Sequence, residues 1–258
     1  SIHQYGQKSK AILERARFNI ANIINCSMNE IIFTCGGTIS NNIALIGTLS
    51  KGDHFITSSY EHPAILNVLK FIKSKEVEIS ILKPEKTGLI DPGKVKSTIK
   101  KNTKLISIMY INNEIGTINP IQEISKIALE NKILFHTDAV QTMGKINLDV
   151  KASMVDMLSL SGHKFYAPKG VGILYVKQNT KINPILFGGG QESGLFPGTE
   201  NIINIGAMAL ATTICCTKKE TQLNYIKELD SYFITLLEKS KIDYTINGRN
   251  RASGIINL

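Results

Sequence analysis

Apolar and polar residues follow one another along the chain in patterns typical of amphipathic helices and of buried strands. At 7–24 the apolar positions recur at helical spacing with charges between them, which predicts an amphipathic helix. Short apolar runs predict buried strands at 31–34, 54–57, 104–110, 133–135 and 157–160. Further apolar segments predict the helices between them, at 43–49, 64–72 and 121–130.

This regular alternation of strand and helix predicts an α/β fold with a doubly wound, mostly parallel sheet flanked by helices. Residues 77–82 alternate in character and predict a strand at or near the sheet edge. Asp91 and Pro92 have the residue types of an N-cap and a first helical position, so a surface helix is expected from there to Lys100. The uncharged run 201–217 is too short and polar to span a bilayer and predicts a buried helix.

Composition narrows the class of protein. With 258 residues, 43% of them hydrophobic and 20% charged, the chain can bury a core without disulfides or metals. The net charge of +9 comes from scattered lysines, which is typical of solvated faces and argues against nucleic-acid binding. The cysteines have neither metal-ligand spacing nor the pattern of a disulfide framework: Cys26, Cys35, Cys215 and Cys216. We therefore expect a cytoplasmic protein without a metal site or a membrane span.

Polar side chains gather where the predicted strands end. The strand at 31–34 runs into C-G-G-T at 35–38, where backbone N–H groups and the Thr38 hydroxyl can cradle an anion, although a plain turn explains this short motif equally well. His62 follows the next strand at the head of a helix, where it either stacks on a planar cofactor or has a structural role. The N-N-E at 112–114 either orients a substrate or caps its own turn.

The segment 159–170 carries the residue on which the chemistry depends. An apolar strand ends there in S-G-H-K, and the residues that follow break regular structure. In open α/β sheets ligands bind beyond the carboxyl ends of the strands, and a partly desolvated Lys164 amine can form a Schiff base there. Taken alone, this segment is more typical of a lysine that is merely solvated in a loop.

Asp138 decides between these interpretations. It follows the strand at 133–135, so Asp138 and Lys164 lie on consecutive core strands. A buried carboxylate can hold the proton on the ring nitrogen of pyridoxal 5'-phosphate, which that cofactor needs in order to accept electrons. A lysine, a carboxylate, an anion cradle and a histidine at successive strand ends together predict a site for this cofactor.

Six segments resemble, in order, the motifs of cysteine desulfurases of the NifS/IscS type, which are pyridoxal-phosphate enzymes of the class V aminotransferase group: FTCGGTISNN, YEHPAIL, NNEIGTINPI, HTDAVQTMGKI, LSLSGHKFYAPKGVGILYV and GGGQESGLFPGTEN. The resemblance runs through the whole chain and implies the fold type I architecture of pyridoxal-phosphate transferases. It also implies a large cofactor-binding domain at 1–210. Residues 211–258 would then form a linking helix and the start of a smaller C-terminal α+β domain.

The resemblance implies a role for each matching residue around the cofactor ring. Lys164 matches the Schiff-base lysine, Asp138 the partner of the ring nitrogen, and His62 the residue stacked on the ring. Gln141 matches the group bonded to the ring oxygen, and Asn113 matches an asparagine near the substrate and the cofactor oxygen. Together these five residues would surround the ring.

Phosphate contacts are implied in the same way. The backbone of Gly37 and the side chains of Thr38, Ser161 and His163 match groups that bind the cofactor phosphate. Thr199 matches a threonine that reaches the phosphate of the other subunit, which implies a homodimer.

The activity implied by the resemblance is removal of sulfur from L-cysteine, giving alanine and an enzyme-bound persulfide. Lys164 would take the α-proton as a general base. The sulfur would pass to an enzyme cysteine, and then to a sulfur acceptor or an iron–sulfur scaffold protein. In the family that cysteine lies downstream of G-T-E-N with an arginine for the substrate carboxylate. We therefore expect this chain to be a fragment that is inactive alone, with the final helix exposing apolar surface around Ile226, Phe233 and Leu236.

Two positions depart from the family pattern. The cysteines of this chain are also not expected to replace the persulfide-forming cysteine of the family. Ile39 stands where glutamate is usual, and Phe196 stands where an arginine is common. Cys35 adjoins the cradle, and the cysteines at 215–216 are expected in the core. The alternatives are a related enzyme, such as a selenocysteine lyase or a class V aminotransferase, and a non-catalytic relative that binds sulfur-transfer partners.

Overall fold

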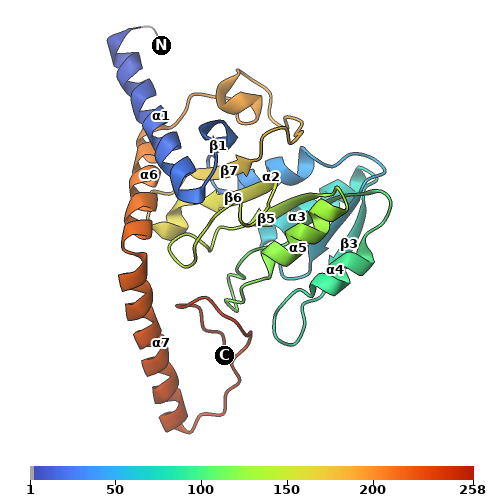
Figure 1. The fold of residues 1–258 in the computed structure, drawn as a ribbon, viewed down its shortest axis with the longest axis vertical. Coiled ribbons are helices and arrows are strands. Elements are labelled where there is room, and N and C mark those ends of the chain that lie inside the picture. The colour runs from blue at the N-terminus through green and yellow to red at the C-terminus, as the bar shows by residue number, and fades with distance from the viewer. Residues whose placement is uncertain (1–2) are drawn as a thin grey trace.

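A seven-stranded sheet with helices on both faces forms the centre of the protein in the computed structural model, which describes residues 3–258 (Figure 1). Its strands are β1 (Ile31–Thr34), β2 (His54–Ser58), β3 (Glu78–Leu82), β4 (Thr103–Ser107), β5 (Leu134–Asp138), β6 (Met157–Ser161) and β7 (Gly172–Val176). The helices are α1 (Gln4–Ile24), α2 (Gly37–Ile46), α3 (Pro63–Ser74), α4 (Pro92–Thr98), α5 (Ile121–Glu130), α6 (Ile202–Thr217) and α7 (Lys219–Ser240). Short 3₁₀ turns are η1 (Met28–Glu30), η2 (Gly162–Phe165) and η3 (Gln191–Gly194).

The strand order β1-β7-β6-β5-β4-β2-β3 confirms the predicted mostly parallel α/β sheet. Strands β6, β5, β4, β2 and β3 run parallel, while β7 is antiparallel to both of its neighbours, β1 and β6. Because β1 and β6 are both antiparallel to β7, they run in the same direction as each other. The carboxyl ends of β1, β2, β4, β5 and β6 therefore meet at one edge of the sheet.

Successive residues of a central strand pack into two different apolar cores, one on each face of the sheet. On β1, Ile31 and Phe33 belong to the core beneath α1, α5 and α6, whereas Ile32 belongs to the core beneath α2 and α3. Side chains alternate between the two faces of a strand, so both faces of β1 must be apolar to be covered by helices. This explains why the central strands appear in the sequence as continuous apolar runs.

Two predicted elements at the sheet margin are confirmed. Strand β3 lies at the end of the strand order, as its alternating pattern predicts, and Ile81 on it is 51% exposed. Asp91 caps α4 through Oδ1, which accepts a hydrogen bond from Gly93 N at 2.8 Å. Helix α4 ends at Thr98, two residues before the expected end.

The uncharged helix α6 is only half buried, so the prediction of a buried helix is wrong for one of its faces. Met208 and Thr212 are fully buried, but Ile203 is 84% and Leu210 62% exposed. The helix packs against α1 and η2 with one side, and no described element covers the other. The absence of charged residues therefore does not by itself indicate burial.

Helix α7 continues beyond α6 and extends past the sheet (Figure 1), and the structure assigns no buried residue to it. Phe233 and Leu236 are exposed, as expected, whereas Ile226 is half-buried. The segment after α7 returns toward the sheet, where Ile118 N donates to Asn250 O at 3.0 Å and Ala252 N donates to Gly116 O at 2.9 Å. No helix within residues 3–258 is both long and apolar enough to cross a membrane.

Candidate active site

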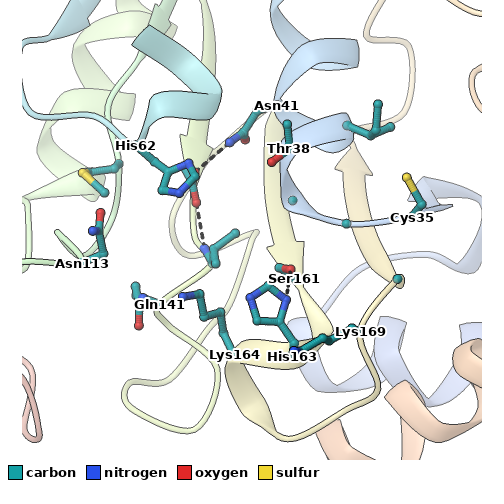
Figure 2. Close-up of a pocket in the computed structure, with 17 residues that line it drawn as sticks. Cys35, Thr38, Asn41, His62, Asn113, Gln141, Ser161, His163, Lys164 and Lys169 are labelled. Carbon is teal, nitrogen blue, oxygen red and sulfur yellow. Dashed lines mark hydrogen bonds between the residues drawn. The ribbon is translucent and has the colours of Figure 1, made fainter. Parts of the chain in front are cut away.

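A cavity of about 440 Å³ opens at the edge where the five strand ends meet. The predicted site residues that line it are Gly37, Thr38, His62, Asn113, Asp138, Gln141, Ser161, His163 and Lys164 (Figure 2). Residues far apart in sequence thus converge because their strands are parallel and end together. The volume lies in the range of small-molecule and cofactor pockets.

The start of α2 forms one wall of the cavity. Gly36 is the N-cap, with φ +153°, and Gly37 begins the helix. A Cβ atom on Gly37 would lie 2.8 Å from Val140 Cγ2, so only glycine fits there without displacement of the neighbouring loop. The first N–H groups of a helix have no partner within it, and together with the helix dipole they favour an anion. Thr38 adds an exposed hydroxyl next to them.

The end of β6 and the turn η2 form the facing wall. Ser161 Oγ and His163 Nδ1 are 3.0 Å apart and hydrogen-bonded, which fixes the imidazole beside the cradle (Figure 2). Partial desolvation lowers the pKa of His163, and the charges of Lys164 and Lys169 lower it further. A neutral imidazole next to the α2 N-terminus can donate or accept one further hydrogen bond.

Asp138 lies at the bottom of the cavity, at the last position of β5, and is 4% exposed. Its Oδ1 accepts from Val140 N at 3.0 Å and its Oδ2 accepts from Asn41 Nδ2 at 2.7 Å. Burial raises the pKa of Asp138, and these two hydrogen bonds, with His62 and Lys164, oppose that rise. A hydrogen bond to each of its two oxygens thus fixes the orientation of the carboxyl group.

His62 is the N-cap of α3, where its Nδ1 accepts from Ala64 N at 3.1 Å. A ring nitrogen that accepts a backbone hydrogen bond carries no proton, so the neutral ring is protonated at Nε2. The His62 side chain reaches into the cavity from the side opposite Lys164 (Figure 2). His62 therefore caps a helix and lines the cavity at the same time, so a structural role does not exclude a role in the site.

Lys164 is an exposed residue that lines the cavity, and the expected partial desolvation of its amine stays a prediction. It stands in η2, directly after β6, and β6 pairs with β5 in parallel, as predicted for consecutive strands. Figure 2 shows its amine directed toward Gln141.

Lys145 belongs to the same region and was not predicted. Its Nζ donates to Gln141 Oε1 at 3.1 Å and to Gln141 O at 3.2 Å. Burial lowers the pKa of Lys145, and the charge of Lys164 lowers it further. The spacing of four residues between Gln141 and Lys145 was the available signal, but the segment 139–145 is a series of turns rather than a helix.

Glu61 is a second residue that the sequence did not reveal. It is 3% exposed, its Oε1 accepts from Ser58 Oγ at 2.5 Å and from Met109 N at 3.0 Å, and its Oε2 has no partner. Burial raises the pKa of Glu61 to about 8, and the nearby Asp138 raises it too. This carboxyl group is therefore protonated at neutral pH, in contrast to an ordinary glutamate at a helix head.

Thr199 is the one predicted site residue outside the main cavity. It lines a neighbouring cavity of about 230 Å³ with Cys35, Gly170 and Phe196. Phe196 packs against the core beneath α2 and α3, and Ile39 does the same. Both departures from the family pattern thus place apolar side chains in a packed region.

A buried ion pair holds the segment that leads to Thr199. Arg17 Nη2 lies 2.5 Å from Glu192 Oε1, and the two side chains are 16% and 3% exposed. Glu192 Oε2 also accepts from Phe33 N at 2.8 Å, so the pair connects α1, β1 and η3. The guanidinium group additionally donates to Ile31 O.

The sequence matches the family described as Aminotransferase class-V over residues 1–258. The chain therefore belongs to the class V aminotransferases, and within them it is of the NifS/IscS cysteine desulfurase type, as its relatives indicate. Cysteine desulfurase IscS of Dictyoglomus turgidum is 46% identical over 264 residues, which cover 100% of this chain and 67% of that protein. The chain spans about two thirds of the length of such curated relatives.

Solved structures agree with the sequence comparison. A NifS-like protein matches with a TM-score of 0.93 and 33% identity, covering 98% of this chain and 70% of the other. A structure described as SspA in complex with cysteine matches with a TM-score of 0.80 and 42% identity, over 83% of this chain and 63% of the other. These likenesses confirm the expected fold type I architecture and the family resemblance. Enzymes of this family depend on pyridoxal 5'-phosphate.

Proposed function

We propose that this chain binds pyridoxal 5'-phosphate in the 440 Å³ cavity and provides the cofactor site of a cysteine desulfurase. The observation that carries the proposal is the convergence of Lys164, the buried Asp138 and the α2 N-terminus in one cavity. Each of these groups has a common structural explanation by itself. Their combination at one sheet edge matches the needs of an anionic, nitrogen-containing ring with an aldehyde.

The residues present fit this cofactor chemically. Gly37 leaves the α2 N-terminus open for a phosphate, and Thr38, Ser161 and His163 offer hydroxyl and imidazole groups around it. At the opposite end, Asp138 offers a carboxylate that is held by two N–H donors. One end of the cavity therefore offers groups that suit a phosphate, and the other end offers a carboxylate that suits a protonated ring nitrogen.

The residues around the cofactor ring have defined tasks in the proposal. Lys164 holds the cofactor and later carries the α-proton of the substrate on Nζ. Asp138 keeps the proton on the ring nitrogen, and His62 covers the ring from the α3 side. Gln141, held by Lys145, and Asn113 donate to the ring oxygen and the substrate. When bound, pyridoxal 5'-phosphate supplies a protonated ring that accepts electrons from the substrate α-carbon.

The proposed reaction removes sulfur from L-cysteine and gives alanine and a persulfide. A thiolate attacks the substrate sulfur and forms the new sulfur–sulfur bond, while the electron pair of the broken carbon–sulfur bond stays with the substrate. The β-carbon then takes up a proton and becomes the methyl group of alanine, and the α-carbon regains the proton that it lost. Burial raises the pKa of Cys26 to about 12 and raises the pKa of Cys215 and Cys216, so these cysteines are protonated thiols. Cys35 lies on the side of the cradle away from Lys164 (Figure 2). We therefore assign the sulfur acceptor to a thiol other than these four.

Several wider features belong to the same proposal. The protein acts as a homodimer in which Thr199 reaches the phosphate of the second copy. Its persulfide serves a sulfur acceptor or an iron–sulfur scaffold protein in the cytoplasm. Residues 1–210 form the cofactor domain, of which Ser1 and Ile2 lie outside the described residues, and residues 211–258 begin the smaller domain.

The proposal is tested by trapping the cofactor. The chain is incubated with pyridoxal 5'-phosphate, reduced with borohydride and digested, and mass spectrometry then locates the modified lysine. We expect the label on Lys164 and its loss in Lys164→Ala, with labelling retained in Lys169→Ala, which changes another lysine of the cavity wall. Label on Lys169 or Lys145 in the unmodified chain would show that the site is assigned wrongly.

A further inference from the structure

Asn41 is a buried residue of α2 that no motif assigned to the site. It is 1% exposed and lines the main cavity. Its Nδ2 donates to Asp138 Oδ2 at 2.7 Å, and its Oδ1 has no hydrogen-bond partner. If this position served packing alone, a leucine would fill it without leaving a polar atom buried and unpaired, which is unfavourable. Packing therefore does not explain an asparagine here.

We propose that Asn41 is a positioning residue that orients the Asp138 carboxylate toward the cavity and keeps it ionised. This inference rests on the proposed function, in which Asp138 holds the ring proton of the cofactor. Asn41 itself touches neither the substrate nor the reacting atoms in this role. It acts through Asp138.

The position of Asn41 on α2 links the two ends of the site. Asn41 follows Gly37 by four residues, so both lie on the same face of the helix. Ile43, Ala44 and Leu45 in the next turn are fully buried, which fixes the helix on the sheet. The helix that presents its N-terminus to an anion therefore also sets the distance to the carboxylate, and Asn41 is the point of contact.

Asn41 is also the only side chain among residues 3–258 that donates a hydrogen bond to Asp138. The second donor is the backbone N–H of Val140, next to Asp138 in sequence. The charged and titratable groups that face Asp138 are His62 at the start of α3, Lys164 in η2 and Glu61 before α3. Unlike these three, the Asn41 amide keeps its donor at every pH, so its support of the carboxylate does not depend on their titration.

The electrostatic consequence follows from burial. Removal from water raises the pKa of Asp138, and the Asn41 hydrogen bond is one of the interactions that lower it. Without Asn41 one carboxylate oxygen would remain buried and unpaired, which favours the protonated form. A protonated Asp138 cannot hold the ring proton of a cofactor in the way that an ionised carboxylate does.

The test measures the titration of Asp138 in the cofactor-free protein by NMR of ¹³C-labelled aspartate carboxyl groups, assigned with Asp138→Asn. Asn41→Leu fills the same space without a donor, and Asn41→Asp replaces the donor by a second carboxyl group. We expect either change to raise the pKa of Asp138 by about one pH unit or more. Asn42→Ala is the matched control, since Asn42 donates only to Thr38 O of its own helix.

A second measurement separates this inference from the proposed function. Binding of pyridoxal 5'-phosphate is titrated by absorbance in the parent, in Asn41→Leu and in Asn42→Ala, and because Asn41 acts only through Asp138 we expect the affinities of the two variants to differ by less than about tenfold. An unchanged Asp138 titration in a folded Asn41→Leu or Asn41→Asp protein overturns the positioning role, whatever the cofactor does. A shifted titration in a chain whose parent does not bind the cofactor supports the role of Asn41 and overturns the proposed function.

Discussion

At the scale of single residues, two buried carboxyl groups with different surroundings lie near one another: Asp138 in the cavity and Glu61 behind its lining. Asp138 accepts hydrogen bonds at both oxygens, whereas Glu61 has one oxygen without a partner. Burial raises the pKa of both groups, and no described hydrogen bond offsets this at Glu61 Oε2. The hydrogen bonds at both oxygens of Asp138 thus oppose the effect of burial on its pKa, whereas one oxygen of Glu61 has no such support, and buried carboxyl groups with different surroundings are typical of functional sites.

The protonation of Glu61 gives a stability prediction with a definite sign. Its pKa is about 8 in the folded protein against an ordinary value of 4.5, so folding favours the protonated form. Stability from this group is fully present below pH 4.5 and is lost as the pH rises through 8. We expect the unfolding free energy of the parent to fall by roughly 3 kcal/mol between pH 5 and pH 8 relative to Glu61→Gln. Urea denaturation at both pH values measures this difference, and parallel pH profiles of the two proteins, or an equal effect of Glu114→Gln at an exposed position, would contradict it.

Asp138→Asn tests the electron-accepting end of the site. An asparagine keeps the shape of the side chain and can still accept the Asn41 hydrogen bond, so cofactor binding should remain largely intact. The neutral amide cannot hold the ring proton, and exchange of the substrate α-hydrogen should slow by about 100-fold or more. Proton NMR of L-alanine in deuterium oxide measures this exchange directly. Equal exchange in the variant and the parent would remove Asp138 from its proposed role.

At the scale of elements, the Arg17 and Glu192 pair fastens η3 to α1 and β1. Breaking a buried pair leaves the other charge without compensation, so Arg17→Met should destabilise the protein by about 3 kcal/mol. Lys10→Met is the matched control on the same helix, because the Lys10 and Glu14 side chains are 67% and 55% exposed. That control should change stability by less than about 1 kcal/mol. Chemical denaturation compares the two, and similar losses for both variants would show that the pair does not anchor η3.

The same scale shows how much of the fold the sequence predicts. Central strands such as β5 and β6 were found because both of their faces must be apolar. Strand β7 was not predicted as an element, because it follows directly on the break at 166–170, and strand direction leaves no local trace in the residues. The burial of α6 was overestimated because its composition says nothing about which neighbours cover each face. Periodicity thus specifies local structure, while pairing and coverage depend on the assembled sheet.

The site was predicted to a similar extent. Residues at the carboxyl ends of strands, such as Asp138, could be found because parallel strands deliver them to one edge. Asn41 and Glu61 could not, because one lies inside a helix and the other next to a more conspicuous histidine, and their importance comes from burial and hydrogen bonds. Their contacts join positions that are distant in sequence.

At the scale of the whole molecule, the distribution of thiols predicts where sulfur does not go. The chain loaded with pyridoxal 5'-phosphate and given L-cysteine should form no persulfide on Cys26, Cys215 or Cys216, because burial keeps these thiols protonated. Alanine should form at no more than a background rate, since no thiolate is placed beside the substrate sulfur. Mass spectrometry and alanine analysis of the parent and of Cys35→Ser make the measurement. Alanine formation that Cys35→Ser abolishes would identify Cys35 as the acceptor and contradict this prediction.

The position of β7 between β1 and β6 also has a consequence for the time at which the site can exist. Phe33 of β1 pairs with Ile173 of β7, and β7 alone connects β1 to the rest of the sheet. A chain growing from its N-terminus on a ribosome has already made the cradle, His62 and Asp138 when β7 is still unsynthesised. Because β1 has no other strand to join among residues 3–258, it cannot take its place in the sheet until β7, which ends at Val176, has left the exit tunnel. The strand that leads into the cradle is therefore the part of this sheet edge that joins late in synthesis, by a pairing of high sequence separation, and such pairings form slowly.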